Sequence, residues 1–188
     1  MKTLTRRRFI ASTALVGGAA LAGCTSDGSI TGTGQQIDTH VAVALQSMYR
    51  QFDGSQAFAQ RAVGMLVIPN ITKAGLFLAG SYGEGALLIG GATVDYFSFA
   101  SASFGLQIGA QQSTQVLFFM TSDALRDFRA SPGFQVGLNA EVVAKEDGGN
   151  FGISSTTSNK PILGIVFGQR GLLAGASLEG AKYSRLVR

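Results

Sequence analysis

Few side chains of this sequence can serve as nucleophiles, general bases or metal ligands. The 188 residues include one cysteine, Cys24, and one histidine, His40. A single cysteine has no partner for an intrachain disulfide, and a metal site would have to rely on carboxylates. We therefore expect no metal and no cofactor. The chemistry that remains for Cys24 is covalent modification of its thiol.

The residues before Cys24 have the features of a secretion signal. Arginines 6 to 8 precede a weakly apolar run from Ile10 to Ala22, which is shorter than the roughly 20 residues of a spanning helix. Leu21-Ala22-Gly23-Cys24 resembles a bacterial lipobox, in which diacylglycerol alkylates the thiol before cleavage makes the cysteine the first residue. We predict a signal peptide at residues 1–23 and an anchor at Cys24 that carries acyl chains such as palmitate.

The start of the signal also resembles the twin-arginine export signature. Its arginine pair is Arg6 and Arg7, and the aromatic Phe9 stands at the expected place. An ordinary positively charged start of a general secretion signal is the alternative. Because Thr25 and not an aspartate follows Cys24, we expect the protein at the periplasmic face of the outer membrane of a bacterial envelope.

Some motifs could in principle support catalysis. Ser81 lies in a stretch that resembles a variant of the hydrolase nucleophile elbow, but the residues after it read as a strand and His40 precedes it. Glu84 and Glu179 are two carboxylates that could perform acid–base chemistry, although glutamates in glycine-rich turns more often accept backbone hydrogen bonds. Glu146-Asp147 reads as part of a hairpin turn. We predict that the protein is not an enzyme.

The charge of the exported chain is balanced. Four of the fifteen lysines and arginines lie in the signal, so residues 24–188 carry eleven basic and eleven acidic side chains. The basic residues are scattered along the sequence, and we expect no nucleic-acid partner. Residues 24–36 are small, polar and rich in glycine, which predicts a flexible tether. The remaining residues, 37–188, have the length of one domain.

The first residues of that domain show the spacing of apolar side chains that is typical of a helix. Apolar side chains recur at steps of three and four residues, at Ile37, Val41, Leu45, Met48 and Phe52. This spacing predicts an amphipathic helix that ends at Gly54. A second short helix is predicted over residues 55–62. Residues 121–131 predict a third, with Thr121 or Ser122 as the N-cap.

After Val63 the pattern changes to short runs of β-branched and aromatic residues separated by glycine. The predicted strands cover residues 64–69, 75–82, 85–90, 95–101, 104–110, 114–120, 134–144, 151–157, 161–167 and 171–180. Many glycines fall inside them, which favours sharp bends and bulges. The expected fold is α+β, with a strongly coiled, barrel-like, mainly antiparallel sheet and two or three helices.

Three separated blocks resemble the SYLF domain family. They are KAGLFLAGSYGEGALL (73–88), SFGLQIGAQQSTQVLFFMTSDALRDF (103–128) and GLLAGASLEGAKY (171–183), and the similarity covers roughly residues 37–185. Eukaryotic members bind phosphoinositide-containing membranes and, in fungi, actin. The chain also resembles a bacterial envelope lipoprotein of this family. The chain departs from the family in having no tryptophan.

The resemblance implies a non-catalytic, lipid-binding domain tethered at the membrane. Residues 37–62 have a net charge of zero, so phosphoinositide specificity is not implied, and actin binding is not expected of an exported bacterial protein. We expect weak contact through apolar side chains, with little preference for charge; the candidates are Val41, Leu45, Met48, Phe52, Phe97 and Phe99. The alternative is a structural lipoprotein that binds an envelope protein instead of lipid.

Overall fold

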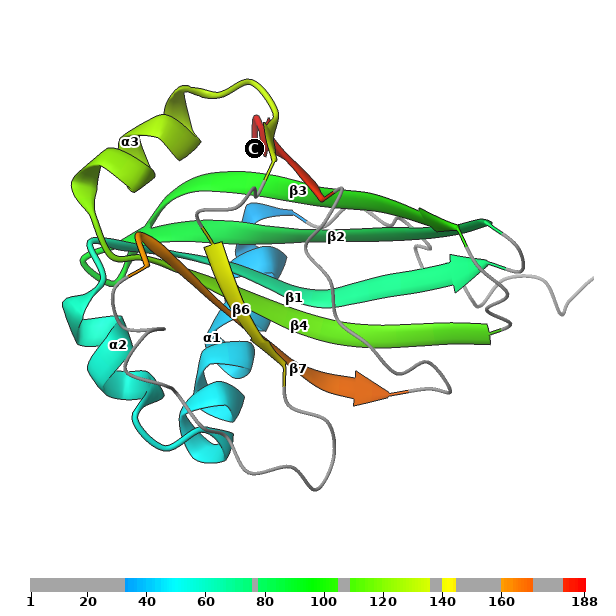
Figure 1. The fold of residues 1–188 in the computed structure, drawn as a ribbon, viewed down its shortest axis with the longest axis horizontal. Coiled ribbons are helices and arrows are strands. Elements are labelled where there is room, and N and C mark those ends of the chain that lie inside the picture. Colours follow the sequence, from blue (N-terminus) through cyan, green and yellow to red (C-terminus); the bar gives the residue numbers. More distant parts are fainter. Residues whose placement is uncertain (1–32, 76–77, 105–108, 136–139, 145–159, 171–180) are drawn as a thin grey trace, which may run out of the picture. The chain divides into compact units, whose positions relative to one another are not determined.

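The fold is α+β, as the sequence predicts. The computed structural model describes residues 33–75, 78–104, 109–135, 140–144, 160–170 and 181–188. These residues form three helices and one eight-stranded sheet with the strand order β5-β8-β3-β2-β1-β4-β7-β6. Helices α1 and α2 lie on one face of the sheet and α3 lies on the other (Figure 1). In the described residues the sheet is not closed, and β5 and β6 lie at its edges.

Helix α1 (Gly34–Gln51) begins with a capping box. The Thr33 hydroxyl accepts a hydrogen bond from the Gln36 backbone N–H, and the Gln36 side chain accepts one from the Thr33 N–H. The helix thus begins at Gly34, three positions before the predicted start. It ends at Gln51, and Gly54, at a φ of 85°, precedes α2 (Ser55–Arg61).

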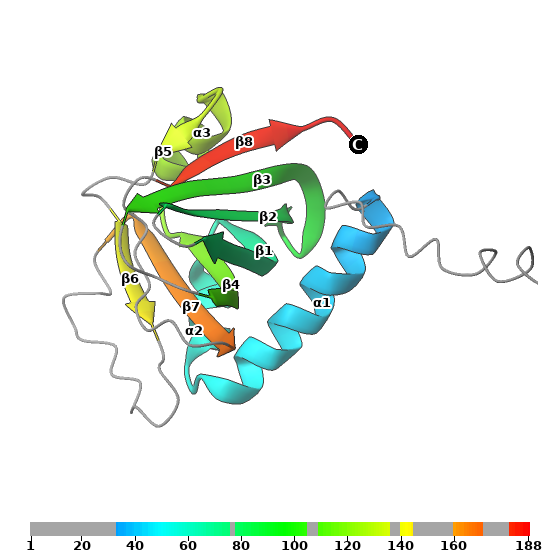
Figure 2. The same ribbon diagram turned by 90° about the vertical axis from the view of Figure 1, so that its right-hand side faces the viewer.

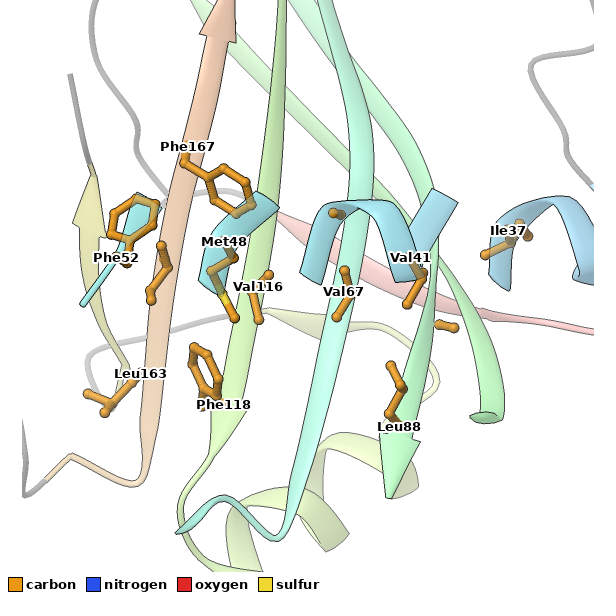
Figure 3. Packing of buried hydrophobic residues seen from close by; sticks show 13 residues of the cluster. Ile37, Val41, Met48, Phe52, Val67, Leu88, Val116, Phe118, Leu163 and Phe167 are labelled. Atoms are coloured by element: carbon orange, nitrogen blue, oxygen red, sulfur yellow. The ribbon is translucent and has the colours of Figure 1, made fainter. Parts of the chain in front are cut away.

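The apolar stripe of α1 packs on the sheet. Ile37, Val41, Ala44 and Met48 are buried against side chains of β1, β2, β4 and β7 (Figure 3). Phe52, just after the helix, meets Phe167 of β7 edge to face, with ring centroids 5.5 Å apart. The helical spacing in the sequence therefore marks a core-facing stripe.

The centre of the sheet is an antiparallel set of four long strands: β1 (Gly64–Gly75), β2 (Leu78–Ile89), β3 (Ala92–Phe104) and β4 (Gly109–Phe119). The sequence predicts six shorter strands here, which is wrong. The predicted break at residues 83–84 does not occur, because these residues continue β2. The chain turns instead at Gly90 and Gly91, whose φ values of 59° and 84° suit a two-residue hairpin.

A line of β-bulges bends the central strands. The pairing of β1 with both of its neighbours shifts around Pro69 and Asn70, and the pairing of β4 with β7 shifts between Gln112 and Thr114. Proline is tolerated in strands at bulges, and bulges increase the local twist. Figure 2 shows the result, since β3 and β8 run across the direction of β6 and β7.

The other face of the sheet carries a second core. Phe128 of α3 (Ser122–Ala130) is fully buried there, with ring centroids 4.7 Å from Phe97 and 4.9 Å from Phe119. Tyr183 of β8 packs against the same group. Both faces of the central strands are therefore apolar, which explains why their sequences lack simple alternation.

The remaining strands are β5 (Phe134–Gln135), β6 (Ala140–Ala144), β7 (Ile162–Arg170) and β8 (Lys182–Leu186). Strand β6 pairs with β7 in parallel, while the other pairs are antiparallel. The predicted strand 134–144 corresponds to β5 and β6, and none of the predicted strands corresponds to β8. The predicted strands 151–157 and 171–180 lie outside the described residues.

Candidate functional site: an arginine-lined pocket between α3 and β8

Helix α3 carries two exposed arginines around its buried phenylalanine. Thr121 caps the helix by accepting a hydrogen bond of 3.3 Å from the Ala124 N–H, and the helix ends before Pro132. With Phe128 held in the core, Arg126 and Arg129 lie on the exposed part of the helix, three residues apart and therefore on neighbouring turns.

Strand β8 brings a third arginine to the same place. Arg185 pairs in register with Phe97 of β3, and its Nη2 atom forms an ion pair with Asp95 Oδ1. The other carboxylate oxygen of Asp95 accepts contacts from Arg129, at 3.1 Å from Nε and 3.0 Å from Nη2. The Asp95 side chain is only 4% exposed, so its buried charge is stabilised by two guanidinium groups.

These arginines line a shallow pocket of about 420 Å³. Its apolar wall comes from Leu125 and Ala130 of α3, and its polar groups are Ser122 and the arginines 126, 129 and 185. Arg126 also contacts the exposed carboxylates of Asp123 (2.9 Å) and Asp127 (3.6 Å). Exposed pairs of this kind contribute little to stability, and therefore Arg126 can exchange its partner for a ligand at low cost.

A guanidinium group presents five N–H donors in a planar fork that matches phosphate and carboxylate oxygens. Asp95 balances only one of the two arginines that it receives, but Asp123 and Asp127 lie beside Arg126, so the three arginines and three aspartates carry no net charge together. The feature that suits the pocket to an anionic group joined to an apolar part is therefore the set of guanidinium donors beside Leu125 and Ala130, and not an excess of positive charge.

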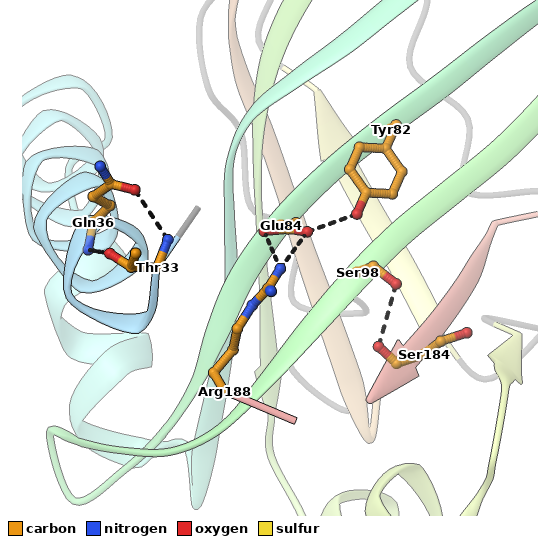
Figure 4. A network of polar contacts seen from close by, with 7 residues as sticks. All are labelled: Thr33, Gln36, Tyr82, Glu84, Ser98, Ser184 and Arg188. Atoms are coloured by element: carbon orange, nitrogen blue, oxygen red, sulfur yellow. Dashed lines mark hydrogen bonds and ion pairs between the residues drawn. The ribbon is translucent and has the colours of Figure 1, made fainter. Parts of the chain in front are cut away.

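A second polar cluster lies elsewhere, on β2. Arg188 Nη2 is 2.8 and 2.9 Å from the two Glu84 carboxylate oxygens, and the Tyr82 hydroxyl donates a hydrogen bond of 2.7 Å to Glu84 (Figure 4). Burial and this hydrogen bond raise the pKa of Tyr82 to about 12. Since the Glu84 side chain is 5% exposed and engaged by Arg188, this cluster joins the C-terminal segment to β2 and does not present a free acid.

The residues predicted to contact lipid require a correction. Five of them are at most 5% exposed, namely Val41, Met48, Phe52, Phe97 and Phe99, and Leu45 is partly buried against the same core as α1. Helical spacing and clustered phenylalanines identify apolar faces, but they do not distinguish a face turned to a bilayer from one turned to a sheet. In this conformation these side chains are part of the hydrophobic core.

The residues weighed for catalysis are not brought together. Ser81 lies within β2, where it pairs in register with Lys73 and Ser101, and not at a turn between a strand and a helix. His40 is exposed on α1. Within the described ranges, no three His, Cys, Asp or Glu side chains are grouped as metal ligands would be.

Several predicted features lie outside the described residues: Arg6, Arg7, Phe9, Cys24, Glu146, Asp147 and Glu179. Among the helices that the structure describes, none combines the length and the apolar character needed to cross a membrane.

The arginine pocket is not apparent from the sequence. Arg126 and Arg129 are close in the sequence, but Arg185 and Asp95 come from distant strands, and the basic residues therefore looked scattered. The only local signal was the pair of arginines on the polar side of a helix whose other side carries Leu125 and Phe128.

Part of the chain is similar to a known protein family. The family described as "Ysc84: Las17-binding protein actin regulator" matches residues 100–186, from the second half of β3 to the end of β8, and thus includes all three arginines of the pocket. No curated protein matches the chain. Residues 100–186 are thus similar to the Ysc84 family, which is the SYLF family that the sequence resembles.

Proposed function

We propose that this domain binds membrane lipids with anionic headgroups through the arginine-lined pocket, while an acylated Cys24 holds the protein at the bacterial envelope. The observation that carries the proposal is the convergence of Arg126, Arg129 and Arg185 beside an apolar wall. A phosphate of the headgroup would be bound by the guanidinium groups, and the adjoining apolar part of the lipid would contact Leu125 and Ala130.

This proposal changes the expected character of the interaction. The sequence predicts apolar contact with little charge preference, but the side chains expected to make that contact are in the core. Arginines at the surface favour anionic lipid, and their attraction is screened over about 8 Å at physiological ionic strength. Binding should therefore be selective for anionic vesicles and should weaken in salt.

The anchor would compensate for weak binding. A domain attached through Cys24 and a short tether stays near the bilayer, which raises its effective concentration there. A pocket of modest affinity would then remain occupied without any additional contact. The proposed role is that of a non-catalytic lipoprotein domain that contacts lipid in the membrane to which it is attached.

Vesicle co-sedimentation of the full chain carrying Cys24→Ser would test the pocket without acylation. Neutral phosphatidylcholine vesicles would be compared with vesicles that also contain phosphatidylglycerol. We expect Arg126→Gln and Arg185→Gln to weaken binding to the anionic vesicles about tenfold, which corresponds to roughly 1.4 kcal/mol. Arg61→Gln on α2 removes an exposed arginine away from the pocket and is the matched control.

An equal loss in Arg61→Gln would show that general charge, and not the pocket, is responsible. If the chain bound no vesicle of either kind, the lipid proposal would be overturned. The alternative of an envelope protein partner, with an acidic segment in the pocket, would then be preferred. Circular dichroism of each variant would establish that the fold is retained.

The anchor is tested separately. Cys24→Ser removes the sulfur that thioether attachment requires, so the variant should incorporate no fatty-acid analogue and should not be cleaved before residue 24. The acyl chains contribute about 0.8 kcal/mol for each buried methylene group, and their loss should release the protein from the membrane fraction. Equal labelling of the variant and the unchanged protein would refute the lipoprotein assignment.

A further inference from the structure

A second cavity, of about 230 Å³, lies between α1 and the bulged part of the sheet. One wall is the second half of α1, from His40 to Gln51. The other wall comes from β1 at Pro69 and Asn70, from β4 at residues 112–114, and from β7 at Phe167 and Gly168. These residues are separate from those of the arginine pocket, which α3 and β8 form.

Two β-bulges form the sheet wall of this cavity. In β1, Pro69 and Asn70 stand opposite the single residue Thr114, and Asn70 has a φ of 54°. In β7, the two residues 168 and 169 stand opposite the single residue Ser113, and Gly168 has a φ of 67°. Bulges interrupt the ladder and re-aim side chains, and they are frequent beside binding sites.

The lining offers little for ionic recognition. Among the residues that the structure describes, no Asp, Glu, Lys or Arg lines the cavity, and His40 is its one side chain that can carry a charge. An ammonium group would lose hydration here without gaining a partner of opposite charge, and a phosphate or carboxylate would find a single histidine at most. The polar side chains are mainly hydroxyls and amides, which donate and accept hydrogen bonds and so match a neutral ligand; they include Ser47, Asn70, Gln112, Ser113 and Thr114.

Most of these groups are available to a ligand. Gln51 donates a hydrogen bond of 2.7 Å to Ser47, but the side chains of Asn70, Gln112 and Thr114 have no hydrogen-bond partner among the described residues. Ala44, Pro69 and Phe167 add apolar atoms to the lining. Hydroxyls and amides beside apolar atoms suit a ligand with hydroxyl groups around its edge and C–H groups on its faces.

The volume limits the size of the ligand. The cavity, at about 230 Å³, is smaller than the roughly 300–1,000 Å³ of pockets that enclose drug-sized molecules. We infer that this cavity is a binding site for one uncharged sugar ring, presented free or as a unit of a larger glycan. This inference does not depend on lipid binding by the arginine pocket.

Ligand-observed saturation-transfer NMR with the full chain would test the site. The probes are glucose and N-acetylglucosamine, with glucuronate as a charged counterpart of glucose, and a chitin-type disaccharide to distinguish a glycan unit from a free sugar. We expect millimolar binding of at least one neutral sugar, insensitive to salt, and weaker binding of glucuronate.

Thr114→Val keeps the shape of the side chain and removes its hydroxyl, and Gln112→Ala removes an exposed amide. Each should weaken sugar binding about fivefold or more, in the range of a lost hydrogen bond. Gln46→Ala on α1 removes an exposed amide that does not line the cavity and should leave binding unchanged, as should Arg126→Gln. Failure of every neutral sugar to bind, or equal effects of the cavity variants and Gln46→Ala, would overturn the inference.

Discussion

The carboxylate of Asp38 on α1 accepts a hydrogen bond of 2.8 Å from the hydroxyl of Tyr96 on β3. Its other oxygen accepts one of 2.9 Å from the Thr93 hydroxyl. Gly34, in the first turn of α1, packs so closely on Tyr96 that a Cβ atom there would lie 2.9 Å from the Tyr96 hydroxyl oxygen. The beginning of α1 is thus fixed to β3 by polar contacts, in addition to the apolar packing that continues along the helix from Ile37.

Asp38→Ala should destabilise the protein by about 1–3 kcal/mol, because two partly buried hydroxyl groups would lose their acceptor. Urea denaturation would measure the change. Asp53→Ala, which removes an exposed carboxylate after the same helix, should have an effect within about 0.5 kcal/mol. Equal losses in the two variants would contradict the anchoring role of Asp38.

Gly85→Ala should be strongly destabilising. A Cβ atom at Gly85 would lie 1.8 Å from the Val67 carbonyl oxygen, so that the backbone of β1 would have to move. We expect a loss of about 3 kcal/mol or more, at the upper end of overpacking effects. Gly80→Ala, in the same strand, is the control because a Cβ atom there would have no neighbour within 4 Å. Similar thermal stabilities of the two variants would contradict the close approach at Gly85.

Arg188→Ala would remove the guanidinium group from the buried carboxylate of Glu84. The expected cost is about 1–3 kcal/mol, since a buried charged acceptor loses two hydrogen bonds. Glu84→Gln combined with Arg188→Ala should be less destabilising than the sum of the single changes, because no buried charge is then left behind. Strict additivity in this double-mutant cycle would show that the two residues do not interact.

The raised pKa values of the four tyrosines predict how stability changes at alkaline pH. Burial raises the pKa values of Tyr49 and Tyr183, and the hydrogen bond to Asp38 together with burial raises the pKa of Tyr96. Burial and Glu84 raise the pKa of Tyr82 to about 12. The unfolded chain therefore loses protons first, near the ordinary pKa of 10, and stability should fall as the pH rises from 10 towards 12.

Ultraviolet titration of tyrosinate would measure this effect. The native protein should show no ionisation phase at the ordinary pKa, whereas the urea-unfolded chain should titrate there. A native phase near pH 10 that disappears in a Tyr82→Phe variant would show that the hydroxyl of Tyr82 is not held by Glu84.

The sequence alone determined the α+β class, the stripe of α1 and the position of α3. These features depend on local rules, namely the helical spacing of apolar residues and the hydroxyl caps, which act within a few residues. Glycine was less informative. At residues 83–85 it permits close approach of β1 within a continuous strand, whereas at Gly90 and Gly91 it forms a turn, and only the pairing of strands distinguishes the two uses.

The tertiary structure decided which apolar residues are exposed and which charges meet. Phe97 and Phe99 are buried because Phe128 of α3 packs on their face of the sheet and Tyr183 of the neighbouring strand β8 packs beside them, which no spacing within β3 could show. Arg185 joins Arg126 and Arg129 because β8 pairs with β3 beside α3. Such contacts form between segments distant in the chain, so the residue types were visible in the sequence while their common pocket was not.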